Sequence, residues 1–406
     1  MKPSFSSRFL QPYRRITSSG SFIPEIDGLR FIAISSVYLY HLAGDIQRHA
    51  PGDSPQFHAT SWLFAVTQIL NIGVPLFFVI SGFILSMPFA MAHSHAGRTV
   101  SLGKYFLRRV TRLEPPYVLS LLVLFALKVA TGRGLAAQLF PNLLASLVYV
   151  HNLVFGVPSA INIVAWSLEI EIQFYILAPL LTLIFVIRRP ALRRLALLAL
   201  LFIATGISTR FPPGHHDSIL GYGQYFLAGF LLTEFYLSGG SRRRKDWRWD
   251  IVSAVGWSAL IVLLVRGSGL AGWILPCLVL ILYIAAFHGK LVNWFVTNLW
   301  ITTIGGMCYT IYLLHNYTVA ALGNLTEGLT LGQPFALRLA VQLLLMTPAL
   351  LVISGLYFRL VERPCMRPHW PRELWGYVTG RVASRAASSS AVVAAAGPAL
   401  AAQEEE

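Results

Sequence analysis

Three ionisable side chains lie where the surrounding hydrophobic sequence makes their burial costly. His41 is inside the hydrophobic segment 23–43, and Glu169 and Glu171 follow Trp166 at the start of another such segment. Ionisable residues at membrane depth are candidates for function. A neutral imidazole can accept a proton from a hydroxyl group and a carboxylate can fix its tautomer, as acyl transfer requires. Taken singly, the histidine equally fits a packing residue, and either acid fits a polar contact between helices.

Arginines add a second kind of chemistry, the binding of phosphate. Arg109 and Arg112 are three residues apart just before a hydrophobic segment, so on a helix they share one face. Guanidinium groups bind phosphate oxygens through paired hydrogen bonds and keep their charge at any working pH. Arg30, inside the first hydrophobic segment, is a third candidate. The alternative for the first two is an anchor in a cytoplasmic loop.

The elements that must position these residues are predicted to be membrane-spanning helices. The chain has 406 residues, 12% of them charged, and a mean hydropathy of +0.62. Hydrophobic runs near the ~20 residues needed to cross a bilayer as a helix recur along it. The sequence therefore predicts an all-α polytopic bundle with about ten spans. They are 24–44, 70–91, 114–130, 164–187, 193–208, 218–238, 250–266, 269–287, 298–322 and 334–358.

The segment 136–155 is also hydrophobic, but Pro141, Asn142, His151 and Asn152 interrupt it, so we expect a re-entrant or interfacial piece.

Basic residues predict the orientation, because lysine and arginine collect in cytoplasmic loops. With ten spans, 25 of the 32 basic residues fall on one side and only four on the other. We therefore expect both termini in the cytoplasm. The net charge of +15 then fits loops beside anionic lipid headgroups and gives no reason to expect a nucleic-acid partner. Arginine predominates over lysine and alanine is frequent, which hints at a bacterial gene, so we expect a bacterial inner membrane.

Cysteine and histidine patterns predict neither disulfides nor a metal site. Cys277, Cys308 and Cys365 are an odd trio in spans or on the reducing side. The pairs His93/His95 and His215/His216 lack further ligands at metal-binding spacing. We expect segment 1–22 to be a basic cytoplasmic segment, 23–364 the transmembrane domain and 365–406 a cytoplasmic tail, disordered from about residue 381.

The predicted direction in which each span crosses the membrane gives the expected depth of its residues in the bilayer. The first span runs from inside to outside, so Arg30 is expected near the cytoplasmic mouth. His41 follows eleven residues later, about 16 Å along a helix. The fourth span runs the other way and begins with its two acids, so these should also lie in the outer half. The sequence thus predicts that His41 and Glu171 meet at similar depth. Arg338, in the last span, is expected to extend to the outer interface.

In these and other motifs the chain resembles the membrane acyltransferase 3 family, whose members acylate sugars and other hydroxylated molecules. The resemblance runs from about residue 23 to residue 364 and rests on six motifs in order. These are Arg30 with His41 after ten intervening residues, the block 73–83 containing Ser81, Arg109-x-x-Arg112, the block Trp166–Tyr175 with Glu171 at the recurrent acid, Tyr309–His315, and Val361-Glu362-Arg363-Pro364.

The sequence departs from the family pattern at a few positions. Pro75 stands where an acidic or polar residue is frequent, and Ile172 where a second glutamate is common. Glu169 is an extra acid, which leaves open whether it or Glu171 is the working carboxylate. Some members carry an esterase-like domain after the membrane part, and the short sequence after the last span predicts a stand-alone member.

The resemblance implies acyl transfer from a cytoplasmic acyl-CoA, most simply acetyl-CoA, to a carbohydrate or other hydroxylated acceptor. We expect Arg30, Arg109 and Arg112 to hold the CoA phosphates while His41 acts as the base and Glu171 orients it. Transfer is either direct or through an acyl-enzyme, and the sequence leaves both routes open. Candidate acceptor contacts are Ser81, Trp166, Glu169, Tyr175, Tyr312 and His315, although Ser81 beside glycine also fits a helix-packing residue.

A different class of protein explains the same buried charges. A secondary transporter or flippase could use arginine, histidine and glutamate to relay protons or bind an anionic solute. Transporters of this kind have a matching pair of broken helices in two halves, and the sequence shows no such pair. Modification of a glycan that depends on a thioester would separate the two functions.

Overall fold

The protein is described by a computed structural model that covers residues 5–16, 22–49, 61–94, 100–211, 217–239, 244–267, 269–367 and 370–371. It is a bundle of helices, and no strand occurs within these residues, which confirms the predicted fold class. The longer helices are α2 (Pro24–Arg48), α5 (Gly73–Ser94), α6 (Leu102–Ala130), α9 (Trp166–Leu181), α10 (Pro190–Ser208), α11 (Ile219–Leu237), α12 (Arg248–Arg266), α13 (Ala271–His288), α16 (Cys308–Thr326) and α17 (Phe335–Tyr357).

Shorter helices join or extend these. They are α1 (Phe5–Leu10), α4 (Ser61–Gln68), α7 (Ala136–Leu147), α8 (His151–Phe155), α14 (Leu291–Val296), α15 (Leu299–Gly306) and α18 (Arg363–Cys365). A π-helical segment, Phe358–Glu362, connects α17 to α18, and the 3-10 turn η6, Glu327–Thr330, follows α16.

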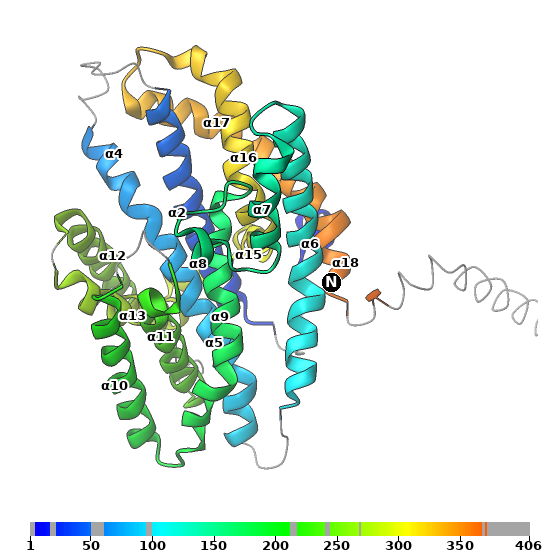
Figure 1. Ribbon diagram of the computed structural model, residues 1–406. Helices are drawn as coiled ribbons and strands as arrows, with labels where there is room; N and C mark the ends of the chain where they lie inside the picture. The colour runs from blue at the N-terminus through cyan, green and yellow to red at the C-terminus, as the bar shows by residue number, and fades with distance from the viewer. Residues whose placement is uncertain are drawn as a thin grey trace, which may run out of the picture.

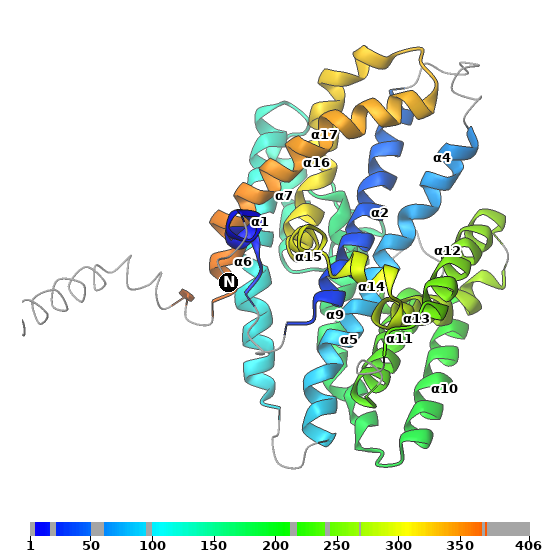
Figure 2. The same ribbon diagram turned by 180° about the vertical axis from the view of Figure 1, so that it is seen from behind.

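The helices form two groups with a central layer between them. Helices α10 to α13 lie on one side, and α6, α7, α16 and α17 lie on the other, as both views show (Figures 1 and 2). Helices α2, α5 and α9 run between the two groups. Helix α11 is buried along most of its length and packs on α5, which explains its hydrophobic residues on every side.

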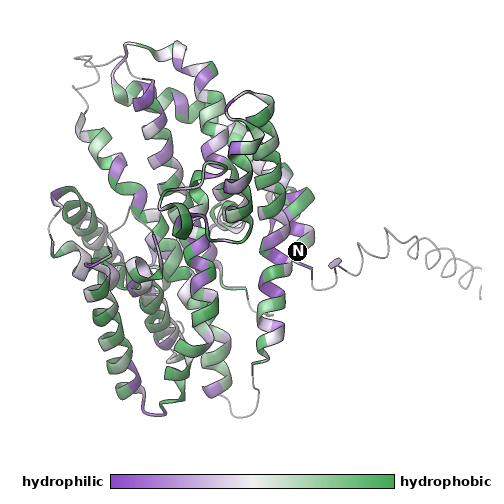
Figure 3. Cartoon of the chain, viewed as in Figure 1, coloured by the Kyte–Doolittle hydropathy of each residue, from purple (hydrophilic) through white to green (hydrophobic). Residues whose placement is uncertain are grey.

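The protein is a multi-pass membrane protein. Seven of its helical segments are long and apolar enough to cross a bilayer. Peripheral helices such as α10 are hydrophobic over most of their length (Figure 3). Each of the ten predicted spans coincides with a helical segment. Three of them, α2, α11 and α16, fall outside the seven because of their polar residues, so the count of ten and the cytoplasmic placement of both termini stay predictions.

The interrupted segment after α6 consists of two short helices, α7 and α8. Glu169 of α9 accepts a hydrogen bond from the backbone N–H of Asn152 in the first turn of α8 (2.9 Å). His151 Nε2 lies 2.7 Å from Oδ1 of Asn142 on α7. The polar residues that interrupt the hydrophobic pattern therefore hold this piece against the bundle, and its re-entrant or interfacial placement stays a prediction.

The prediction for Arg338 is wrong. Its side chain is buried, and Nη2 donates to Oε2 of Glu327 at 2.6 Å. An acid in the turn after α16 lies within reach, so an ion pair forms inside the protein and the side chain does not extend to the interface. The sequence alone did not show that residues eleven apart in two segments would pair.

Helix α15 approaches the first turn of α2 very closely at Gly305. A Cβ atom on Gly305 would lie 1.8 Å from the carbonyl oxygen of Asp27, so only glycine fits there. This contact places the start of α16 beside the first turns of α2.

Candidate active site

A cavity of about 110 Å³, lined by charged and apolar side chains together, lies between the helices. Helices α2, α5, α6, α9 and α16 line it, and so does the end of the π-helical segment. Among the lining side chains are those of Arg30, Arg109, Arg112, Glu171, Ser81 and Tyr312. The cavity therefore brings together residues from all six motifs recognised in the sequence, which only the folded chain places side by side.

Asp27 holds the arginine at the mouth of this cavity. Asp27 is buried and lies one turn before Arg30 on α2. Nη1 of Arg30 donates a hydrogen bond to Oδ1 of Asp27 at 2.7 Å. Arg15, from the segment before α2, donates from Nε to Oδ2 at 2.8 Å. One carboxylate thus fixes two guanidinium groups, and the remaining N–H groups of Arg30 are available to the cavity.

The second arginine cluster comes from α6. The guanidinium of Arg109 lies over the rings of Tyr175 (5.3 Å to the ring centroid) and Tyr105 (5.7 Å). Such contacts orient a cation without neutralising its charge. Arg112 lines the cavity on the same face of α6, and its buried Nε has no hydrogen-bond partner among the described residues.

Two acids face these arginines. Glu171 Oε1 accepts hydrogen bonds from Ser81 Oγ (2.8 Å) and from Tyr175 Oη (2.5 Å). Glu362 Oε2 accepts from the hydroxyl of Thr310 (2.5 Å) at the start of α16. The polar groups of α5, α9 and α16 therefore position both carboxylates, and no direct ion pair of Arg109 or Arg112 is found with the residues that the structure describes.

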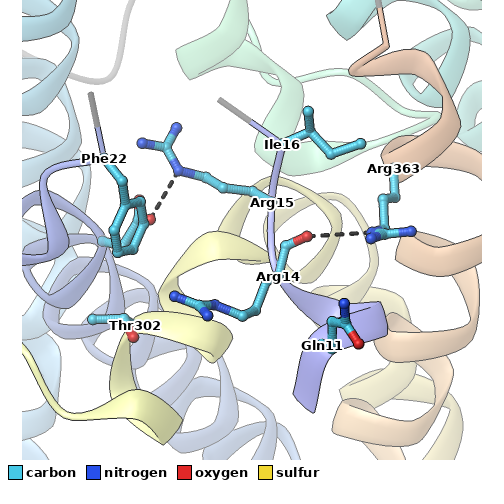
Figure 4. A pocket seen from close by; sticks show the side chains of 8 residues that line it. Gln11, Arg14, Arg15, Ile16, Phe22, Thr302 and Arg363 are labelled. Carbon is cyan, nitrogen blue, oxygen red and sulfur yellow. Dashed lines mark hydrogen bonds and ion pairs between the residues drawn. The ribbon is translucent and has the colours of Figure 1, made fainter. Parts of the chain in front are cut away.

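A wider pocket of about 330 Å³ lies next to this cavity, around the segment before α2. Arg14, Arg15 and Arg363 surround it, and Arg363 Nε donates to the backbone carbonyl of Arg14 at 3.3 Å (Figure 4). The guanidinium of Arg14 lies 5.6 Å from the ring centroid of Phe22. Asp27 lines this pocket and Arg30 lines the cavity. The ion pair between these two side chains therefore lies between the pocket and the cavity.

Guanidinium groups crowd together at this pocket. Burial, and then the neighbouring charge of Arg30, lower the pKa of Arg15 to about 10, although Asp27 opposes the shift. The group still carries its proton at neutral pH. A site that crowds guanidinium groups in this way favours a polyanion.

Two histidines, His315 and His41, lie beside the lining residue Tyr312 but are not themselves among the residues that line the cavity. Tyr312 Oη lies 2.5 Å from Ser167 Oγ, and its ring packs on that of His315 (5.7 Å between centroids). The rings of His315 and His41 are 5.0 Å apart. His315 Nδ1 lies against two backbone carbonyl oxygens, those of Tyr312 and Ile311, and must therefore carry the hydrogen. Its buried Nε2 is an acceptor without a donor among the described residues.

The predicted meeting of His41 with Glu171 is not found within the described residues. The hydrogen bonds of Glu171 go to Ser81 and Tyr175, and it lies among the arginines. The ring contacts of His41 are with Tyr40 and His315. An equal depth estimated by counting residues along two helices does not determine how far one helix is shifted along the other or how each is rotated about its axis. The shift and the rotation together decide which side chains meet, and here they place His41 and Glu171 apart.

The remaining candidates divide into residues that line the cavity and residues that do not. Ser81, Tyr175 and Tyr312 line it. Trp166 packs its ring on Tyr222 (5.5 Å), and Glu169 is bound to the backbone of α8. Of the two acids of α9, Glu171 is therefore the one at the cavity.

Sequence reasoning missed three charged residues of the site, Asp27, Arg15 and Glu362. The spacing of Asp27 three residues before Arg30 is a helical ion-pair signal that could have been read. Glu362 was part of a motif but carried no assigned role. Nothing in the sequence placed Arg15 at Asp27 and the wider pocket, because a nonhelical segment brings it there.

Comparison with known proteins agrees with this arrangement. The model of the acyltransferase domain (acyltransferase 3) matches residues 23–359. The chain is similar to the peptidoglycan O-acetyltransferase OatA of Listeria monocytogenes, with 27% identity over 381 residues, 85% of this chain and 56% of that protein. It is also similar to the exopolysaccharide production protein ExoZ of Rhizobium meliloti, with 28% identity over 349 residues, 80% of this chain and 99% of that protein.

A third relative is the O-acetyltransferase OatA of Staphylococcus aureus, which is 24% identical over 328 residues, 73% of this chain and 50% of that protein. The chain thus spans about half the length of the OatA proteins it matches. No solved structure matches the chain.

Proposed function

The chain belongs to the acyltransferase 3 family, and from this premise we propose that it transfers an acyl group from a cytoplasmic acyl-CoA to a carbohydrate hydroxyl. The observation that carries the proposal is the cavity itself. Its lining includes arginines suited to phosphate and also Tyr312, whose ring packs on His315, which in turn contacts His41. A donor with phosphates at one end and a reactive thioester at the other fits such a cavity.

The donor would lie along α2. Arg30, Arg109 and Arg112 would hold the diphosphate, and the arginines around the neighbouring pocket give room for the nucleotide end. From Arg30 to His41 is eleven residues, about 16 Å of helix, which an extended pantetheine arm can span. The thioester would then reach the level of the histidines.

At that level His41 would act as general base. It takes the proton of the acceptor hydroxyl while the oxygen attacks the thioester carbonyl, the C–S bond breaks and the thiolate of CoA leaves. The proton then passes from the imidazolium to the thiolate, so the products are an ester and free CoA. The buried Nε2 of His315 would accept a hydrogen bond from His41 and fix its tautomer, the role first expected of Glu171.

Glu171 would act on the donor end. Its carboxylate lies among the arginines and accepts from Ser81 and Tyr175. It would position these guanidinium groups by charge and keep them apart when no donor is bound. Ser81 donates its hydroxyl hydrogen to this carboxylate, which supports a positioning role and not that of a nucleophile.

The acceptor and the acyl group follow from the relatives. OatA is named a peptidoglycan O-acetyltransferase and ExoZ an exopolysaccharide production protein. We propose an acetyl group and a cell-envelope polysaccharide that reaches the two histidines from the outer side. A bacterial inner-membrane location with both termini in the cytoplasm completes the proposal.

Transfer of radiolabel tests this function. The purified chain in lipid vesicles, given [1-14C]acetyl-CoA and envelope glycan fragments, should release free CoA and yield alkali-labile label on the glycan. Vesicles without protein control for chemical acetylation. Gradient-driven uptake of a solute, with no thioester consumed for any acyl-CoA or glycan supplied, would instead make the protein a transporter.

A further inference from the structure

A second group of buried charges lies at the end of the bundle remote from Arg30. Asp45 and His49 come from the last turn of α2 and its cap, and Glu327 begins the turn η6 after α16. One carboxylate oxygen of each acid and one ring nitrogen of His49 lie within 4.8 Å of one another. Asp45 and Glu327 are almost fully buried, at 1% and 3% exposed, and His49 is half-buried.

One oxygen of each acid lacks a hydrogen-bond donor among the described residues. His49 Nδ1 lies 3.7 Å from Oδ2 of Asp45 and 3.0 Å from the backbone carbonyl oxygen of Asp45, and its Nε2 lies 3.3 Å from Oδ1 of Asn324, so a bound cation would replace one of these hydrogen bonds. Oδ2 of Asp45 and Oε1 of Glu327 are buried, and neither has a hydrogen-bond partner among the described residues. A Cβ atom on Gly323 would lie 2.2 Å from Oδ2 of Asp45, so this glycine makes room for the carboxylate. Two buried carboxylate oxygens facing one space are unfavourable unless a positive species lies between them.

The other oxygen of each acid is held by an arginine. Arg48 donates to Oδ1 of Asp45 at 2.5 Å, and buried Arg338 donates to Oε2 of Glu327 at 2.6 Å. Carboxylates that ligate a metal through one oxygen commonly have the second oxygen fixed in this manner by outer hydrogen bonds. The arginines therefore orient the two free oxygens and do not fill the space between them.

We propose that Asp45, His49 and Glu327 bind one divalent zinc ion. One imidazole and two carboxylates are three ligands of the type zinc takes, and a water molecule would complete a tetrahedron. An imidazole ligand disfavours calcium and magnesium, which prefer oxygen donors throughout. Among the described residues, Arg338 is the buried arginine paired with these acids and Arg48 is largely exposed, so the two buried carboxylates outweigh the one buried guanidinium group.

The ion would join α2 to the turn after α16. Asp45 is one helical turn beyond His41 on α2, and α16 carries His315. A zinc ion here would hold the two helices together just beyond the point at which the imidazoles meet. The sequence patterns gave no sign of this site, because its ligands are close only in the folded chain.

Zinc content and zinc affinity test the proposal. The full-length chain, purified without a histidine tag and stripped with a chelator, should bind one zinc ion per chain in calorimetric titration. His49→Gln should weaken zinc binding at least about tenfold. Glu327→Gln should abolish it, and zinc should raise the melting temperature of the wild type but not of this variant.

The matched control is His93→Gln. His93 is an exposed histidine on α5 and should contribute nothing to the stoichiometric site. Because His49 is half-buried at the end of its helix, its variant is expected to fold even where Glu327→Gln does not. Absence of zinc binding, affinity unchanged in His49→Gln, or tighter binding of calcium than of zinc would overturn the assignment. None of these readouts depends on acyl transfer.

Discussion

Replacing His41 with alanine is expected to lower the rate of acyl transfer about a thousandfold or more. The variant lacks the imidazole proposed to take the proton of the acceptor hydroxyl, and general-base catalysis is worth about 10²- to 10⁴-fold. Binding of acyl-CoA should stay near the wild-type level, because Arg30, Arg109 and Arg112 line the cavity and His41 is not among its lining residues. Initial rates with labelled acetyl-CoA, together with donor affinity, provide the measurement.

Variants of His315 test whether this residue orients the His41 ring without itself acting as the base. His315→Ala should lower kcat about tenfold to a hundredfold with KM for the donor unchanged, because His41 then lacks the acceptor that fixes its tautomer. His315→Gln places an amide oxygen near the same position and should restore part of the rate. Full activity of a folded His41→Ala protein would contradict the base assignment, whatever the His315 variants show.

Replacing Arg112 with alanine is expected to raise KM for acyl-CoA about tenfold to a hundredfold. A charge-assisted hydrogen bond contributes about 1.5–3 kcal/mol, and about 1.4 kcal/mol corresponds to a factor of ten in affinity. The buried Nε of Arg112 is free to bind the donor, because it has no partner among the described residues. Saturating donor should restore most of kcat, since the reacting atoms lie elsewhere.

Arg266→Ala is the matched control for this prediction. Arg266 is an exposed arginine at the end of α12, so its loss changes the net charge equally without touching the cavity. An unchanged KM in Arg112→Ala, or an equal rise in both variants, would show that the cavity arginines do not bind the donor.

The helical bundle could be predicted because each span repeats a simple physical requirement. About twenty apolar residues are needed to cross a bilayer, and every predicted span coincides with a helical segment. The grouping of Arg30 with Arg109 and Arg112 was also predictable, since basic residues at span ends share one side of the membrane.

The partners of the buried charges were not predictable in the same way. Depth along a helix follows from residue count, but the rotation of a helix and its offset from its neighbours depend on packing. For this reason Glu171 is found with the arginines, and His41 contacts His315. Arg338 likewise pairs with Glu327, which only the turn after α16 brings within reach.

Protection of Cys308 tests most directly that the cavity is the donor site. Cys308 begins α16, is partly exposed and lines the cavity with Arg30. With Cys277 and Cys365 changed to serine, alkylation of Cys308 by N-ethylmaleimide should slow at least about tenfold at saturating acetyl-CoA. Arg112→Ala should shift this protection to higher donor concentration. An alkylation rate that saturating acetyl-CoA leaves unchanged would contradict the account.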